Sequence, residues 1–146
     1  YLATVDFGGH YGWPWFYWRL PDHRVQPQRP DLQQYVKRPN YALGAHTASL
    51  GLAFAGTAEL GPNFANGAFI GQHGSWNRKP VSGYDVIFVP FAKGEPSGKP
   101  INVLTGFLDK DGNAQGRPTM LAMAKDGSLL VSDDVGNIIW RVRAKN

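Results

Sequence analysis

The sequence of 146 residues contains no cysteine. Disulfide bonds, thiolate metal sites and cysteine nucleophiles are therefore excluded. This absence does not identify the compartment, because an oxidising environment permits disulfides without requiring them. The sequence also has no apolar run that approaches the ~20 residues of a transmembrane helix. It shows neither an initiator methionine nor a signal peptide at Tyr1, so we expect it to be a piece of a longer protein.

Clustered positive charge is also missing. The formal net charge is +4, yet no run of five or more basic residues occurs and the excess is spread along the chain. Nucleic acid is therefore not an expected partner, and the charge fits solubility or a site for a small anion. Few segments show the apolar period of a helix, whereas 18 glycines and 11 prolines punctuate short apolar runs. This pattern predicts an all-β protein.

The clearest strand pattern lies near the C-terminus. Three short apolar runs occupy residues 119–124, 128–132 and 137–142. The turns between them are Lys125-Asp126-Gly127 and Asp133-Asp134-Val135-Gly136, in which glycine accepts a positive φ without steric cost. We therefore predict an antiparallel meander of three strands, which needs further strands beside it to be stable in water.

Four more strands are predicted upstream, at residues 48–55, 68–72, 84–91 and 99–104. Residues 84–91 are apolar on both faces, which is typical of a strand buried on both sides. Four strands followed by three suggest the repeated four-stranded blades of a β-propeller, with a β-sandwich as the alternative.

The N-terminal part differs in composition. Residues 1–18 are rich in aromatic residues and glycine, and residues 19–44 are rich in proline and polar residues, which predicts an irregular connection. The expected organisation is therefore an aromatic loop and connection at residues 1–44, one four-stranded blade at 45–107 and three strands of a final blade at 108–146.

Three stretches carry a resemblance to a known family. They are YGWPWFY at residues 11–17, AHTASLGLAFAG with IGQHGSWNR at 45–56 and 70–78, and the segment from Gly116 to Val142. Together they resemble the C-terminal part of the sorbosone dehydrogenase-like proteins, which belong with the soluble glucose and aldose sugar dehydrogenases that use pyrroloquinoline quinone (PQQ). The GQHGSWNR stretch is the most specific of the three.

The resemblance implies a six-bladed β-propeller, of which this chain would form the last two to three blades. It implies a periplasmic or secreted oxidoreductase that transfers a hydride from a sugar or aldehyde, such as glucose or sorbosone, to PQQ, with Ca²⁺ orienting the cofactor. The general base and the calcium ligands of the family lie mainly upstream of Tyr1. We therefore expect this chain alone to be inactive on sugars.

Several residues are candidates for binding the cofactor: Arg117, Arg78, Trp76, His73 and His46. The resemblance places an arginine such as Arg117 against the carboxylates of PQQ, and a guanidinium binds a carboxylate through two parallel charge-assisted hydrogen bonds. In the loop after residues 68–72, Gly74 would allow close backbone approach to a ligand, Trp76 could stack on the quinone, and Arg78 or Lys79 would supply charge. His46 could hold a polar group of the substrate.

Each candidate also has a purely structural interpretation. Arg117 would then be a surface residue at the start of a strand, residues 73–78 a hairpin loop with a packed Trp76, and His46 a hydrogen-bonded loop residue. Residues 109–113 imitate the first half of a calcium loop, but Ala114 and Met120 stand where glycine and glutamate are needed, so we predict a turn and no metal site.

The positions of these residues give one further expectation about function. Because each candidate lies at a strand boundary, Arg117, His46 and residues 73–78 should lie at one end of the strands, which would favour the dehydrogenase over a non-catalytic propeller that binds a ligand or protein. A third hypothesis is structural. The apolar run at residues 137–142 would form an open blade edge, so we expect a companion segment or self-association there.

Overall fold

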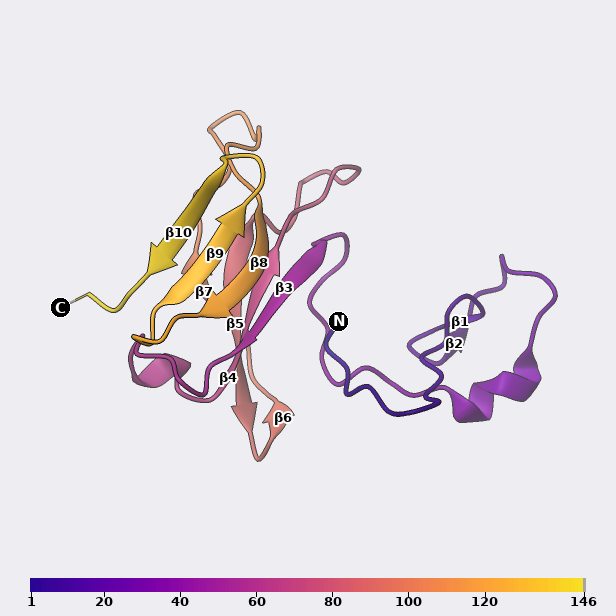
Figure 1. Ribbon diagram of the computed structural model, residues 1–146. Helices are drawn as coiled ribbons and strands as arrows, with labels where there is room; N and C mark the ends of the chain where they lie inside the picture. The colour runs from indigo at the N-terminus through magenta and orange to yellow at the C-terminus, as the bar shows by residue number, and fades with distance from the viewer. Residues whose placement is uncertain (146) are drawn as a thin grey trace. The chain divides into compact units, whose positions relative to one another are not determined.

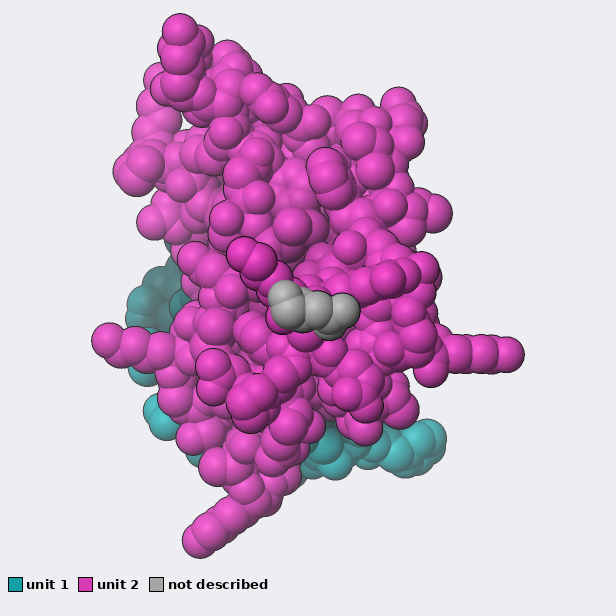
Figure 2. All heavy atoms as spheres, turned by 90° about the vertical axis from the view of Figure 1, so that its left-hand side faces the viewer, with its two compact units in different colours: residues 1–42 teal, residues 43–146 magenta. Residues whose placement is uncertain are grey.

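Two antiparallel sheets dominate the computed structural model, which describes residues 1–145 (Figure 1). Over these residues the chain is all-β apart from two short 3-10 helices, and none of its sheets is closed. It divides into two compact units, residues 1–42 and 43–146, coloured separately in Figure 2. Within residues 1–145, no helix has the length and apolar character to cross a membrane.

The first sheet of unit 2 contains the four strands expected upstream. Its main strands are β3 (Ser49–Phe54), β4 (Gly67–Gln72), β5 (Asp85–Ala92) and β7 (Ile101–Leu104). They pair in the order β3-β4-β5-β7, and the two-residue β6 (Glu95–Pro96) pairs with the far end of β5. Val86, Ile87, Phe88 and Val89 are all buried, so the expectation that this strand is buried on both faces is confirmed.

The second sheet is the predicted C-terminal meander. Strands β8 (Pro118–Met123), β9 (Leu129–Asp133) and β10 (Ile138–Val142) pair in the order β8-β9-β10. Gly127 adopts a φ of 75° in the β8–β9 turn, and its N–H donates to the carbonyl of Ala124 at 3.0 Å. Each predicted boundary lies within one residue of the observed strand, because turn chemistry and alternation are local signals.

One apolar core joins the two sheets. Phe69, Val86 and Phe88 of the first sheet cluster with Leu121, Leu129 and Val131 of the second. The rings of Phe69 and Phe88 lie 4.9 Å apart. Burying a side chain of this size contributes about 1.5–3 kcal/mol. The packing of β3 and β4 on β8 therefore fixes the two sheets relative to each other, and with them the loops at their ends.

Unit 1 holds more regular structure than the sequence predicted. A short hairpin joins β1 (Phe16–Tyr17) to β2 (Leu20–Pro21), and the 3-10 helix η1 spans Pro30–Tyr35. The expectation of a purely irregular connection was therefore wrong. Proline is compatible with the first turn of a helix and with a two-residue edge strand, because neither requires its missing N–H. A second 3-10 helix, η2 (Pro62–Phe64), lies in unit 2.

Candidate functional site

The loops of the first sheet converge where β4 ends and β3 and β5 begin. Backbone hydrogen bonds join them: His73 N–H donates to Ala48 O and Gly74 N–H to Thr47 O, each at 2.9 Å, while Tyr84 N–H donates to Gln72 O at 3.0 Å. Antiparallel pairing therefore brings the loops before β3, after β4 and before β5 to one end of the sheet.

Gly74 makes room for an aromatic ring at this end. A Cβ at Gly74 would overlap the ring of Tyr84, and Gly74 has a φ of 97°, so a side chain is excluded on both counts. The sequence predicted that a ligand would approach Gly74 closely, whereas in the structure the ring of Tyr84 occupies this space. The buried Tyr84 hydroxyl donates to the carbonyl of Ser75.

Arg117 reaches this ring from the second sheet. Its Nη2 donates to Tyr84 Oη at 2.9 Å, and its guanidinium carbon lies 4.8 Å from the ring centroid, which is cation–π geometry. The Tyr84 hydroxyl donates its only hydrogen to the carbonyl of Ser75, so its oxygen accepts the hydrogen bond from Arg117. Among residues 1–145, no other hydrogen bond or ion pair engages this guanidinium, which leaves N–H donors for a ligand.

Asp133 holds the backbone of Arg117 in place. It is buried, and its carboxylate accepts hydrogen bonds from the N–H groups of Arg117 and Gly136 (both 2.8 Å) and Val135 (3.2 Å) and from Trp140 Nε1 (3.1 Å). Burial by itself raises the pKa of Asp133, but these donors outweigh it and hold the pKa below its ordinary value. A charged Asp133 therefore organises the start of β8 and the β9–β10 turn.

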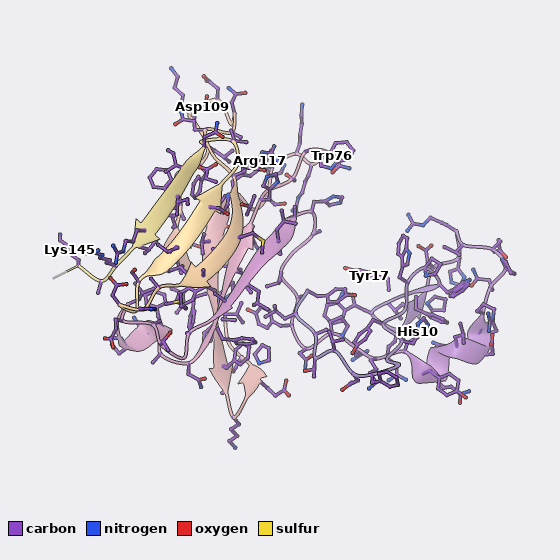
Figure 3. The ribbon with its side chains drawn as sticks, in the orientation of Figure 1. His10, Tyr17, Trp76, Asp109, Arg117 and Lys145 are labelled. Carbon is purple, nitrogen blue, oxygen red and sulfur yellow. The ribbon has the colours of Figure 1, made fainter. Side chains whose placement is uncertain are left out.

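His73 and Asp134 form a second link between the sheets. His73 Nε2 lies 3.0 and 3.1 Å from the two carboxylate oxygens of Asp134. Two contacts thus join the sheets, His73–Asp134 and Tyr84–Arg117. With the partners that hold them in each sheet, we call these residues the loop cluster: His73, Ser75, Tyr84, Arg117, Asp133 and Asp134. Figure 3 shows Arg117 and Trp76 at the same end of unit 2, away from Lys145.

The five candidates from the sequence do lie at one end of the strands, as expected. His73 and Arg117 belong to the loop cluster. Arg78 donates to Ala45 O at 2.9 Å and so ties its loop to the one that carries His46. His46 is exposed and outside the cluster, with a φ of 61°, and Trp76 is 86% exposed at the loop. Their role in binding a cofactor stays a prediction.

Sequence reasoning did not find the side-chain contacts of Tyr84, Asp133 and Asp134. Tyr84 was predicted to begin a strand. In the structure β5 begins at Asp85, and Tyr84 has a φ of 67° outside the strand region. The two aspartates were interpreted only as turn residues. The adjacent carboxylates were the single available signal, because the partners of both residues lie far away in the sequence.

Acidic and histidine side chains do not gather into a metal-binding group within the described residues. Within residues 1–145, no group of three or more His, Asp or Glu side chains is placed to hold a metal ion. The loop that imitates a calcium loop is a turn closed on itself, since Asp109 Oδ1 accepts from the N–H groups of Asp111 (2.9 Å) and Asn113 (2.8 Å).

Two surface hollows lie elsewhere. One of about 520 Å³ is within unit 1, lined by Trp18, Arg19, Leu20, Pro30, Asp31, Gln33, Gln34 and Arg38. One of about 200 Å³ lies beside the β8–β9 turn, lined by Glu59, Asp126, Ser128, Arg143 and Ala144. Neither includes a member of the loop cluster.

Comparison with known proteins identifies the family of this chain. The family model described as TrAA12-like matches residues 26–145. The chain belongs to the TrAA12-like family. Its relatives include an uncharacterized protein of Borreliella burgdorferi, 31% identical over 142 residues, which cover 96% of this chain and 37% of that protein.

Solved structures support the same assignment. The holo PQQ domain of pyranose dehydrogenase from Coprinopsis cinerea is 27% identical with a TM-score of 0.61, over 77% of this chain and 30% of that one. The calcium structure of a Trichoderma reesei AA12 enzyme is 21% identical with a TM-score of 0.72, over 98% of this chain and 40% of that one, which shows a shared fold. The TrAA12-like chain thus spans less than half the length of these relatives and is similar to the PQQ domain of a pyranose dehydrogenase.

Proposed function

We propose that this TrAA12-like chain supplies the carboxylate-binding part of the PQQ site in a dehydrogenase of sugars or related aldehydes, such as glucose or sorbosone. The observation that carries the proposal is the Arg117 guanidinium, which Tyr84 holds in place while other N–H donors remain for a ligand. The C. cinerea relative with a holo PQQ domain supports it. We continue to expect a periplasmic or secreted enzyme, from the family resemblance.

The architecture supports a partial propeller. In unit 2, a sheet of sequential antiparallel strands packs face to face on the next sheet through β3, β4 and β8. Successive blades of a propeller pack in this way around a central channel. We therefore assign unit 2 to neighbouring blades of a six-bladed propeller, with the remaining blades supplied by the rest of the full-length protein.

The chain's own residues suit PQQ, whose carboxylates complement a positioned guanidinium. When bound, PQQ supplies the quinone that accepts a hydride. Arg117 would hold a carboxylate in the charge-assisted geometry that a planar guanidinium favours. The exposed Trp76 offers an aromatic face at the same end of the sheets (Figure 3). Arg78 donates to a backbone carbonyl and so holds its loop in place.

The test is a PQQ titration followed by quenching of tryptophan fluorescence. We expect saturable binding to the 146-residue chain. Arg117→Lys keeps the charge and removes the planar fork, so it should weaken binding by about 10-fold or more, since hydrogen bonds to charged groups contribute ~1.5–3 kcal/mol. Arg143→Lys, in the loop beyond β10, is the matched control and should bind as the wild type does. Equal binding by all three proteins, or none, would favour a non-catalytic propeller.

A further inference from the structure

The contact between His73 and Asp134 determines which imidazole nitrogen carries a hydrogen. Both oxygens of Asp134 approach His73 Nε2, and an ionised carboxylate can only accept hydrogen bonds. Nε2 must therefore carry a hydrogen. In the neutral ring the other nitrogen, Nδ1, is then the acceptor.

Nδ1 is the unused end of this pair. Among residues 1–145 no protein group hydrogen-bonds to it. The His73 side chain is 22% exposed, so the ring is partly buried. The loop cluster thus holds two groups with unused hydrogen-bonding capacity. They are the Nδ1 acceptor of His73 and the remaining N–H donors of Arg117.

Asp134 is held in place through its neighbour. Asp133 is committed to the backbone and Trp140, and its carboxylate closes the turn by accepting from Val135 and Gly136. The adjacent Asp134 is 55% exposed and has His73 as its hydrogen-bond partner. The turn therefore presents one carboxylate to its own backbone and the next to the opposite sheet.

We propose that Asp134 is a positioning residue, which holds His73 so that Nδ1 receives a hydrogen bond from a ligand that Arg117 binds by its carboxylate. This inference rests on the proposed function and refines it. The site then selects ligands that combine a carboxylate with an N–H or O–H donor. A carboxylate alone satisfies Arg117 and leaves His73 Nδ1 without its donor.

Two small probes separate these contributions. Pyrrole-2-carboxylate carries a carboxylate beside an N–H, and furan-2-carboxylate has the same shape with an acceptor oxygen in that place. Binding of each to the 146-residue chain is measured by NMR chemical-shift titration, at a pH where the imidazole signals of His73 show the neutral ring. We expect the wild type to bind the pyrrole ~2–10-fold more tightly, the range for one neutral hydrogen bond.

The variants distinguish the inference from the proposed function. Asp134→Ala and His73→Gln should reduce the preference for the pyrrole, whereas Arg117→Lys should weaken both probes. Asp111→Ala removes an exposed aspartate of another loop and is the matched control. The Nε2–H proton of His73 should also be visible in the wild type and lost by rapid exchange in Asp134→Ala, which tests the pair without any ligand.

Three results would overturn the inference. An unchanged pyrrole preference in Asp134→Ala, with Arg117→Lys still weakening both probes, would remove the role of Asp134 and leave the proposed function intact. A His73 Nε2–H signal insensitive to Asp134→Ala would do the same. Failure of both probes to bind the wild type would overturn the inference together with the carboxylate site.

Discussion

At the scale of single residues, buried and exposed aspartates act as acceptors for loops and turns. Asp133 accepts four hydrogen bonds within the loop cluster. Asp126 acts in the β8–β9 turn, where it accepts from Ser128 and pairs with Arg141 of β10. Both stay ionised because donors surround them, so their contribution to stability depends on charge.

Replacing Asp133 with asparagine tests the first of these sites. The asparagine side chain would turn an N–H₂ group toward N–H donors, so buried donors would lose their acceptor. We expect Asp133→Asn to lower the free energy of unfolding by about 2–4 kcal/mol in urea. Asp134→Asn changes the exposed neighbour and should cost about 0.5 kcal/mol or less. Equal stability of the two variants would contradict the role of Asp133.

The acid limb of the stability curve tests Asp126. The Ser128 hydroxyl, the Ser128 N–H and Arg141 lower its pKa to about 2, from the ~3.9 expected in the unfolded chain. A depressed folded-state pKa gives stability that is present above the unfolded pKa and is lost as pH falls through the folded pKa. The melting temperature should therefore fall between about pH 4 and pH 2, and less steeply in Asp126→Asn.

Asp111→Asn provides the control for that experiment, since Asp111 is exposed and lies outside the Asp126 network. Its melting curves should follow those of the wild type across the acid range. Identical acid slopes for the wild type and Asp126→Asn would show that Asp126 does not contribute in this way.

At the scale of elements, β3 of the first sheet and β8 of the second approach each other closely. Gly51 of β3 faces the backbone of Thr119 and the side chain of Leu121, and an added Cβ would overlap the Thr119 carbonyl oxygen and lie 2.9 Å from Leu121 Cγ. A backbone oxygen within a sheet cannot move aside cheaply. The absence of a side chain at Gly51 therefore determines how closely the two sheets pack.

Gly51→Ala should therefore destabilise the chain by about 1–3 kcal/mol through overpacking, seen as a lower midpoint of urea unfolding. Gly56→Ala provides the contrast, because a Cβ there meets no atom within 4 Å. That variant should be neutral or more stable by up to about 1 kcal/mol. A Gly51→Ala protein as stable as Gly56→Ala would mean that the sheets separate without cost.

At the scale of the whole molecule, apolar surface remains uncovered on unit 2. In the part of the chain that the structure describes, strand β10 pairs with β9 alone, and Ile139 is 71% exposed. Figure 2 views unit 2 from the side on which β10 lies. On the first sheet, Leu50, Leu52 and Phe54 of β3 are about half exposed or more. An uncovered strand edge of this kind favours pairing with another chain.

The isolated chain should therefore self-associate, with a sedimentation coefficient that rises with protein concentration. Ile139→Lys places a charge on the exposed part of β10 and should shift the chain toward the monomer. Val81→Lys, which adds the same charge in a loop, should behave as the wild type. A monomeric wild type at every concentration tested would rule out an adhesive edge.

The sequence by itself determined the strands of unit 2 and the all-β class. Alternating apolar residues and turns such as Lys125-Asp126-Gly127 are local signals, so boundaries in residues 118–142 were predicted within one residue. It did not predict β2, β6 or the 3-10 helices, which are too short to produce a periodic pattern. It also placed the candidate residues at one end of the strands, because strand boundaries are local as well.

Only the tertiary structure decided which of these residues act together. Arg117 meets Tyr84 across 33 positions of sequence, and His73 meets Asp134 across 61. No periodicity or spacing encodes such pairs. They exist because the apolar core and the close approach at Gly51 fix one sheet on the other, and a shift of a few ångströms between β3 and β8 would separate both of these pairs.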